Sequence, residues 1–391
     1  MAATLYHGAD IFDGEWLGPG ALLVEDGRIA ALLAPDAGAD GARRVELDGG
    51  ILVPGFVDLQ LNGGGGVMFN DDPSVGTLAT MAEAHAGLGA LTILPTLITD
   101  TPEITEAAVA AVEAAVAAGV PGIAGLHLEG PHLSHARKGA HDPALIRPMG
   151  EGDLAFLAGA AKRVPRLLVT LAPENVTTVQ IGALAKAGVI VSLGHSDAGY
   201  DTCRAAAAAG ATLATHLFNA MSQLGNRQPG LVGAVLATGA LHAGLIADGI
   251  HVHPAAIRTA LAAKEGPGQL FLVTDAMAPA GTAITSFTLN GREIRREAGR
   301  LTLANGTLAG ADLDMARALR VLVGDVGLAL DRALGMATQI PARVARLSEG
   351  CGALQPGRNA DFLHLTSDLH LSRIWRKGRE LALSSADQII R

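Results

Sequence analysis

A carboxylate and two imidazoles each follow a short apolar run, at three well separated places in the chain. Glu129 follows residues 123–128, His195 follows residues 189–194, and His216 follows residues 211–215. The three apolar runs are strand-like, so each polar side chain stands at the end of a separate strand. One carboxylate and two imidazoles that converge in this way can hold one metal ion and leave a position open for substrate, as catalytic metal sites do.

A fourth apolar run, residues 271–274, leads into Asp275 in the same manner. An aspartate beside a metal can take a proton from water, so the pattern favours a metal-dependent hydrolase. His127 lies two residues before Glu129 and therefore on the same face of an extended strand, which makes it a weaker candidate ligand. Imidazole and carboxylate ligands suit Zn²⁺ and also Fe²⁺ or Mn²⁺, so they leave the identity of the metal open.

The elements that must position these residues alternate between strand-like and helix-like segments. The candidate strands are residues 56–60, 91–95, 123–129, 167–172, 189–194, 211–216, 243–248 and 271–275. Helix-like segments lie between them, at residues 104–118, 179–187, 201–209 and 254–264. This rhythm predicts an α/β fold, a (β/α)8 barrel of the TIM type, in which the ends of the strands meet on one face. A doubly wound open sheet is the alternative, but residues 63–66 lack the spacing of its phosphate-binding turn.

The two ends of the chain have a different pattern. Asp26-Gly27 joins two apolar runs and predicts a hairpin, and further short strands are expected after Ala360 and around Gly378. We expect residues 1–53 and 355–391 to form a small β-sandwich domain, and residues 54–354 to form the barrel.

Composition limits the possible partners. The 391-residue chain is 49% hydrophobic, and its net charge of -9 without a basic stretch argues against binding to nucleic acid. The segment from residue 104 to 120 contains Glu106 and Glu113 and is too polar to span a membrane. Only Cys203 and Cys351 occur, far apart, so no disulfide framework is indicated. The start of the chain lacks a signal-peptide pattern, and we expect a cytoplasmic protein without membrane contact.

Seven short motifs occur along the chain. They are His127–Pro131, Lys138–His141, Leu171–Glu174, Gly194–Ser196, Thr215–Met221, Ala247–His251 and Val273–Ala276. Single pieces such as Gly194-His-Ser are weak signals, but seven in the right order are specific. Together they resemble the N-acetylglucosamine-6-phosphate deacetylases of the amidohydrolase superfamily, and the resemblance covers nearly the whole length of the chain.

The resemblance implies a reaction and a role for each residue. The enzyme would remove the acetyl group from N-acetyl-D-glucosamine 6-phosphate, in amino-sugar catabolism and cell-wall sugar recycling. Glu129, His195 and His216 would hold the metal, and Asp275 would act as general base and then as general acid. His141 would contact the acetyl carbonyl oxygen and stabilise the oxyanion.

The resemblance also implies one divalent metal per chain. Many amidohydrolases begin the barrel with His-x-His, which supplies a second metal position, whereas this chain has Gln60 and Asn62 there. Amides replace imidazoles poorly as ligands, so Gln60 and Asn62 would mark a vestigial second site. Zn²⁺ is the first expectation for the single metal, with Fe²⁺, Mn²⁺ or Co²⁺ as alternatives.

Substrate recognition is likewise implied by matching positions. Arg227 and His251 would bind the phosphate, and the family places such an arginine across the interface of a homodimer. The backbone of Asn219 and Ala220 would add donors, and Leu308, Ala309 and Gly310 resemble a family loop that lies against the sugar. Two alternatives remain at this stage: an amidohydrolase that acts on another N-acyl or cyclic amide, and a catalytically inactive scaffold.

Overall fold

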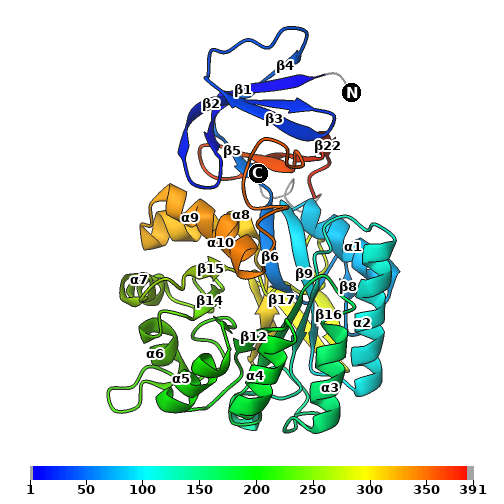
Figure 1. Cartoon of the computed structure of the whole chain (residues 1–391), viewed down its shortest axis with the longest axis vertical. Helices are drawn as coiled ribbons and strands as arrows, with labels where there is room; N and C mark the ends of the chain where they lie inside the picture. Colours follow the sequence, from blue (N-terminus) through cyan, green and yellow to red (C-terminus); the bar gives the residue numbers. More distant parts are fainter. Residues whose placement is uncertain (1–2, 385–391) are drawn as a thin grey trace.

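The computed structural model describes residues 3–384, and its centre is a barrel of eight parallel strands (Figure 1). The strands are hydrogen-bonded in chain order, with β6 at one end of the ladder and β15 at the other. This arrangement confirms the predicted (β/α)8 barrel. The barrel strands are β6 (Phe56–Leu61), β9 (Ala90–Ile98), β10 (Leu126–Glu129), β11 (Leu167–Leu171), β12 (Ile190–Leu193), β13 (Leu213–Ala214), β14 (His242–Leu245) and β15 (Leu270–Leu272).

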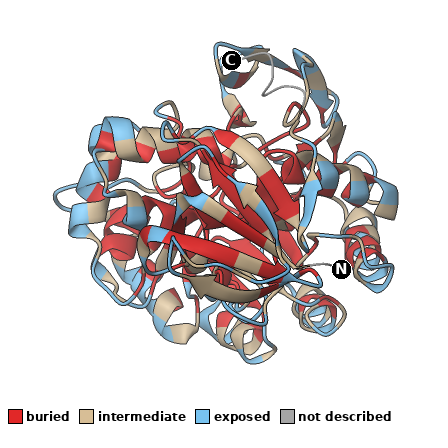
Figure 2. Ribbon diagram, turned by 90° about the horizontal axis from the view of Figure 1, so that it is seen from above, coloured by how far each residue is buried: buried red, intermediate tan, exposed pale blue. Residues whose placement is uncertain are grey.

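Helices surround the barrel and turn their apolar sides towards it (Figure 2). α2 shows why they begin where they do: the Thr101 hydroxyl accepts the N–H of Ile104, and Pro102 occupies the first turn. The helices are α1 (Val75–Ala86), α2 (Pro102–Ala117), α3 (Glu151–Ala160), α4 (Thr178–Lys186), α5 (Tyr200–Ala209), α6 (Gly230–Ala237), α7 (Pro254–Ala263), α8 (Met315–Arg320), α9 (Leu330–Ala337) and α10 (Gln339–Val344). Two short helices complete the set, η1 (His135–Arg137) and η2 (Val321–Val326).

Strands from both ends of the described chain form a separate eight-stranded sheet beside the barrel. β5 pairs with β20 through Val53 and Leu363, which joins the two ends. Tyr6, Phe362 and Trp375 pack together in the core of this sheet. Its strands are β1 (Thr4–Phe12), β2 (Leu17–Glu25), β3 (Arg28–Leu33), β4 (Arg43–Glu46), β5 (Ile51–Pro54), β20 (Phe362–Leu365), β21 (Leu371–Arg376) and β22 (Arg379–Leu381). The domain borders given above stay a prediction.

A four-stranded antiparallel sheet follows β15 and corrects one expectation. Residues 308–310, expected in a loop, belong instead to its last strand, β19. The turn Asn290-Gly291 between two strands is a hairpin signal that the sequence already carried. The strands of this sheet are β16 (Ser286–Leu289), β17 (Arg292–Glu297), β18 (Arg300–Leu303) and β19 (Leu308–Ala311), and a further hairpin joins β7 (Gly63–Gly64) to β8 (Val67–Met68).

Three barrel strands are shorter than the sequence predicted. β12, β13 and β15 end two or three residues before His195, His216 and Asp275. The backbone φ angles of these three residues are 45°, 29° and 52°. A left-handed conformation interrupts an extended strand, and this explains why each strand stops before its functional residue.

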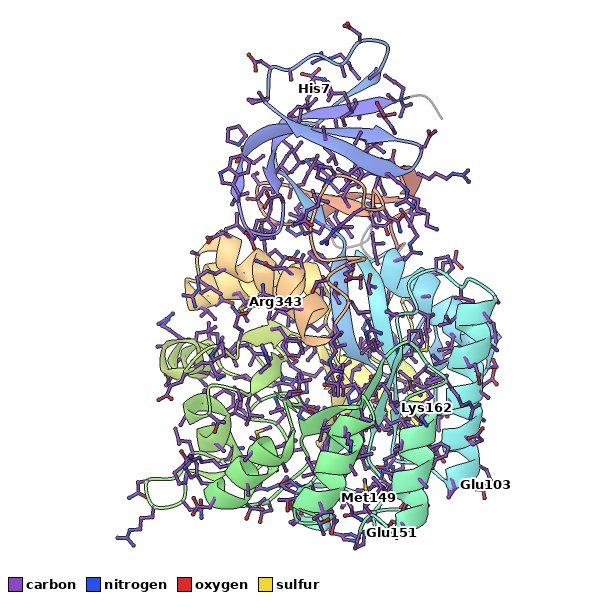
Figure 3. All side chains as sticks on the ribbon, in the orientation of Figure 1. His7, Glu103, Met149, Glu151, Lys162 and Arg343 are labelled. Carbon is purple, nitrogen blue, oxygen red and sulfur yellow. The ribbon has the colours of Figure 1, made fainter. Side chains whose placement is uncertain are left out.

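The barrel strands end on the side that faces away from the terminal sheet. Figure 3 labels His7 in the terminal sheet at the top, and Glu103 and Glu151, in the first turns of α2 and α3, near the bottom. Because each helix begins where the preceding strand has ended, the carboxyl ends of the strands open towards the bottom of this view. Within residues 3–384 no helix combines the length and apolar character needed to cross a membrane.

Candidate active site

Three predicted ligand atoms meet at the carboxyl ends of the barrel strands. Glu129 Oε1 lies 3.1 Å from His195 Nε2 and 3.2 Å from His216 Nε2. The two imidazole Nε2 atoms lie 3.0 Å apart. All three side chains are buried. The structure therefore brings together the carboxylate and the two histidines that the sequence placed on separate strands.

Glu129, His195 and His216 form a triangle, and the protonation of these groups shows that it needs a cation or a proton at its centre. His195 Nδ1 lies 2.8 Å from the carbonyl oxygen of Arg137, which can only accept, so Nδ1 carries the proton. Nε2 of a neutral His195 is then an acceptor, and it faces the acceptor oxygen of Glu129. Such atoms repel one another at this distance unless a cation or a proton lies between them. Two imidazoles and a carboxylate form a donor set that suits a single divalent metal, so the residues fit one.

The pKa shifts of Glu129 and His216 show the same need for positive charge beside the carboxylate. Burial alone would raise the pKa of Glu129, but hydrogen bonds and charge interactions with His195 and His216 hold it well below its usual value. Burial would likewise lower the pKa of His216, yet the bond to Glu129 and the negative charge of that residue raise it. The carboxylate is thus kept ionised at the centre of the site.

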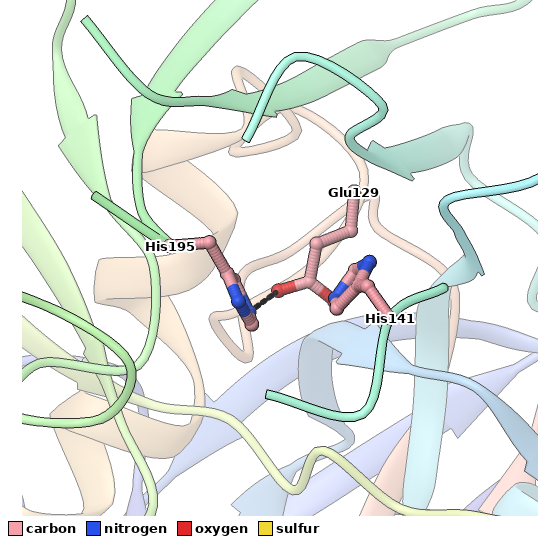
Figure 4. A group of neighbouring side chains, drawn as sticks. All are labelled: Glu129, His141 and His195. Atoms are coloured by element: carbon pink, nitrogen blue, oxygen red, sulfur yellow. Dashed lines mark ion pairs between the residues drawn. The ribbon is translucent and has the colours of Figure 1, made fainter. Parts of the chain in front are cut away.

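His141 lies next to both Glu129 and His195 (Figure 4), and the centroids of the His141 and His195 rings are 4.4 Å apart. Glu129, His141 and His195 each offer a ligand atom within 4.8 Å of the others. His141 Nδ1 lies 2.8 Å from the Thr99 hydroxyl, which can donate or accept, and 3.3 Å from the Thr99 backbone N–H, which can only donate. The neutral tautomer that accepts this N–H carries its ring proton on Nε2. That Nε2–H is 3.9 Å from Glu129 Oε2. Burial, with the nearby histidines, lowers the pKa of His141 to about 3, and the side chain is a neutral hydrogen-bond donor.

Asp275 is linked to the same carboxylate through Gln60. The Gln60 amide nitrogen lies 3.3 Å from both Glu129 Oε1 and Asp275 Oδ1. Asn62 Nδ2 donates to Asp275 Oδ1 at 2.8 Å. Burial raises the pKa of Asp275, and the charge of Glu129 adds to the effect. Gln60 and Asn62 thus act as hydrogen-bond donors to the two carboxylates.

His127 lies outside this group of ligands. Its Nε2 is 2.7 Å from the hydroxyl of Thr170, and its Nδ1 is 3.2 Å from the hydroxyl of Thr96. Burial lowers the pKa of His127 to about 4, so the ring is neutral. Both nitrogens of this weaker candidate are engaged with neighbouring strands, one layer below Glu129.

A cavity of about 530 Å³ opens above the triangle. Most predicted site residues line it: Asn62, Glu129, His141, His195, His216, Asn219, Ala220, His251, Asp275, Leu308 and Gly310. His251 is oriented by Asp248, whose Oδ2 lies 2.6 Å from His251 Nδ1. Gln60 is buried beneath the cavity and reaches it through its bonds to Glu129 and Asp275.

Besides Gln60, two further predicted site residues do not line this cavity. Ala309 is buried and packs in the apolar cluster behind β19, because neighbouring residues of a strand face opposite sides. Arg227 is exposed, in the segment before α6 that projects from the barrel (Figure 1). Within a single chain, therefore, the structure does not bring Arg227 to the candidate metal ligands.

Sequence reasoning missed a cationic residue of the cavity wall, Arg137. Its Nε lies 2.8 Å from Asp197 Oδ1, and its carbonyl oxygen accepts the bond from His195. Arg137 directly precedes the Lys138–His141 motif, so the motif boundary was the signal that could have pointed to it. It is the only lysine or arginine on the cavity wall within residues 3–384.

Comparison with known proteins places this geometry in a family. The amidohydrolase family model matches residues 51–381. The N-acetylgalactosamine-6-phosphate deacetylase of Shewanella sp. (strain ANA-3) is 42% identical, over 92% of this chain and 91% of the relative. The N-acetylglucosamine-6-phosphate deacetylase of Haemophilus influenzae is 37% identical, over 88% of this chain and 90% of the relative.

Solved structures give the same result. The N-acetylglucosamine-6-phosphate deacetylase of Pasteurella multocida superimposes with a TM-score of 0.92 at 36% identity, covering 97% of this chain and 100% of that one. A mutant of the Mycobacterium smegmatis deacetylase, in complex with N-acetyl-D-glucosamine-6-phosphate, gives a TM-score of 0.90 at 34% identity, covering 98% and 100%. These comparisons confirm the resemblance drawn from the motifs and the hydrolase class. The chain belongs to the amidohydrolase family.

Proposed function

We propose that this chain hydrolyses N-acetyl-D-glucosamine 6-phosphate to D-glucosamine 6-phosphate and acetate, in cytoplasmic amino-sugar catabolism and cell-wall sugar recycling. One observation carries the proposal: a triangle of Glu129, His195 and His216 stands beside Asp275 at the floor of one cavity. The named activity of the relatives supports the choice of substrate. The intact set of residues argues against an inactive scaffold.

Glu129, His195 and His216 would hold one divalent metal, with Zn²⁺ as our first choice and Fe²⁺, Mn²⁺ or Co²⁺ as alternatives. When bound there, the metal supplies a Lewis acid that polarises the amide carbonyl and acidifies water. The Arg137 carbonyl keeps the proton of His195 on Nδ1, so that Nε2 remains available as a ligand atom.

Asp275 would move the proton. Both Asn62 and Gln60 donate to Oδ1, which leaves Oδ2 as the oxygen that takes a proton from the attacking water. The raised pKa of this partly buried carboxyl suits a group that must first accept and then release a proton. The same proton then passes to the amide nitrogen, the C–N bond breaks, and the amine and acetate leave.

His141 would stabilise the negative charge that develops on the carbonyl oxygen. Its Nε2–H lies beside Glu129, while Thr99 fixes the other nitrogen. A donor that is held in place before the reaction stabilises an oxyanion without further rearrangement. Because the ring is neutral, it donates without adding a second charge to the metal site.

The phosphate would be bound by His251, by the backbone at Asn219 and Ala220, and by arginine. We propose a homodimer in which the exposed Arg227 reaches the partner's cavity, while Arg137 contributes from within the chain. A guanidinium suits phosphate because its planar donors match two oxygens at once.

The test is release of acetate from N-acetyl-D-glucosamine 6-phosphate and from the unphosphorylated sugar, with metal content measured on the same sample. We expect turnover of the phosphorylated sugar to dominate. Equal rates would favour another amide as the substrate, and no release from metal-loaded protein would contradict deacetylation.

A second candidate substrate is N-acetyl-D-galactosamine 6-phosphate. The 42% identical relative from Shewanella carries that activity in its name. The two sugars differ only in the configuration at C4, so the same chemistry serves both. The ratio of kcat/KM for the two epimers, measured on one preparation, decides between them.

A further inference from the structure

We propose that Asp58 and Thr274 form a positioning pair, which closes the barrel next to Asp275 and fixes the direction of that catalytic carboxylate. The inference rests on the proposed function, because it concerns the base of that reaction. Neither residue lines the cavity, so their action reaches the substrate only through Asp275 and Gln60.

The pair lies where the barrel ladder is weakest. The regular ladder runs from β6 to β15 and does not continue between these two strands. Near the carboxyl ends the gap is joined by backbone bonds, from Asp275 N to Gln60 O at 2.9 Å and from Asn62 N to Ala276 O at 2.7 Å. One isolated bridge, between Leu61 and Ala276, accompanies them. The closure of the barrel is thus concentrated around Asp275.

Asp58 supplies the remaining connection with its side chain. Its Oδ1 accepts the N–H groups of Gln60 at 3.2 Å and of Thr274 at 3.3 Å. Its Oδ2 accepts the hydroxyl proton of Thr274. The carboxyl is completely buried, and within residues 3–384 it has no ion-pair partner. Such a group is costly to bury unless it is fully hydrogen-bonded, so a leucine or valine would be expected here if only packing mattered.

Thr274 holds the backbone on both sides of Asp275. Its hydroxyl donates to Asp58 and accepts the N–H of Ala276 at 3.3 Å. Asp275 lies between these two anchored residues with a φ of 52°. A left-handed aspartate persists only where the surrounding structure determines it. The pair therefore supplies the constraint that keeps the Asp275 side chain aimed into the cavity.

The Asp58 carboxyl group also positions Gln60. Asp58 fixes the Gln60 backbone N–H, and the Gln60 amide contacts both Glu129 and Asp275. One buried carboxyl thereby sets the relative placement of a metal ligand and the base. Loss of the pair should misdirect the base, while Glu129, His195 and His216 keep their mutual contacts.

The experiment compares Thr274→Val, which removes the hydroxyl at nearly constant volume, with Thr274→Ser, which keeps it. For the metal-loaded protein we expect Thr274→Val to lower kcat by about 10- to 100-fold, the scale of a small misplacement of a catalytic group. KM and the metal content should stay near the wild-type values, and Thr274→Ser should recover most of kcat. Asp58→Asn serves as a second variant if Thr274→Val does not fold.

Val57→Ala is the matched control, because it destabilises the same strand from a fully buried position outside the pair. We expect it to lower Tm without a comparable loss of kcat. A Thr274→Val enzyme with wild-type kcat would overturn the inference, as would an equal loss of kcat in Val57→Ala at the same Tm. Wild-type acetate release is measured first, so failure of the proposed function is recognised separately. Hydrogen exchange at residues 274–276, faster in Thr274→Val than in Thr274→Ser, tests the pair without any turnover.

Discussion

His195 and His216 point their Nε2 atoms at each other across 3.0 Å, and the carboxylate of Glu129 closes the third side of the same triangle. The bond from His195 Nδ1 to the Arg137 carbonyl fixes which nitrogen is protonated. Without a cation or an additional proton, lone pairs would face one another inside a buried site. This geometry supports our proposal that the two histidines are two of the three ligands of one metal ion.

The first prediction is one tightly bound divalent metal per chain. Adding metal to chelator-treated protein should raise Tm, with a stabilisation of about 2.7 kcal/mol at 100 times Kd. His216→Ala should lose both the metal and the shift in Tm, whereas the exposed His135→Ala should keep them. Elemental analysis that finds two tightly bound metals would show that Gln60 and Asn62 do not block a second position.

The second prediction concerns the base. Asp275→Asn keeps the shape of the side chain but cannot take the proton of water. We expect kcat to fall by about 10²- to 10⁴-fold or more, because the residue serves as base and then as acid. The metal content should not change. A variant with near-native turnover would show that Asp275 is not the base, and His141 would then be the next candidate.

A third prediction separates two roles for His141. If its Nε2–H stabilises the oxyanion, His141→Ala should lower kcat by about 10²- to 10³-fold and leave the metal in place. If His141 were a ligand, as its position within 4.8 Å of Glu129 and His195 would permit, the metal would be lost instead. Metal analysis on the same sample as the kinetics distinguishes the two outcomes. The bond from Thr99 N to Nδ1 favours the first.

The positions of Glu129, His195 and His216 could be predicted from sequence because the barrel geometry largely determines them. Strands that run in parallel bring their carboxyl ends to one face, so a polar residue after each apolar run is directed to the same place. The exact ends of the strands could not be predicted. They depend on left-handed backbone at His195, His216 and Asp275, which only the completed site enforces.

Other features depend on contacts between distant segments. Arg137 reaches the cavity because the loop after β10 folds over His195, and Arg292 of β17 donates to the carbonyl of Ala140 in the same loop. The adjacent Lys138–His141 motif could have drawn attention to Arg137, but the contacts themselves join segments that are distant in the sequence. The strand at residues 308–310, by contrast, could have been predicted locally, because hairpin signals were present in the sequence. The alternation of side chains along β19 explains why Leu308 and Gly310 line the cavity and Ala309 does not.

The fourth prediction concerns the phosphate. The chain carries a net charge of -9, so its overall field gives a dianionic substrate no help. Local cations must supply the attraction. Loss of one charge-assisted contact costs about 1.5–3 kcal/mol, or roughly 10- to 100-fold. We expect Arg137→Ala and Arg227→Ala each to lower kcat/KM for the phosphorylated sugar by about this factor, and to affect the neutral sugar little. The exposed Arg295→Ala is the control.

The position of Arg227 allows a sharper test, because it is exposed and lies away from the cavity of its own chain. Arg227→Ala chains mixed with Asp275→Asn chains should form heterodimers that regain activity if the arginine crosses the interface. One site then combines an intact Asp275 with the partner's intact arginine, whereas the other site lacks both. Arg137→Ala mixed with Asp275→Asn should regain nothing beyond the activity of Arg137→Ala alone, because Arg137 lines the cavity of its own chain. Failure of the Arg227 pair to complement, in a mixture shown to contain heterodimers, would place both arginines in the same subunit as the base they serve.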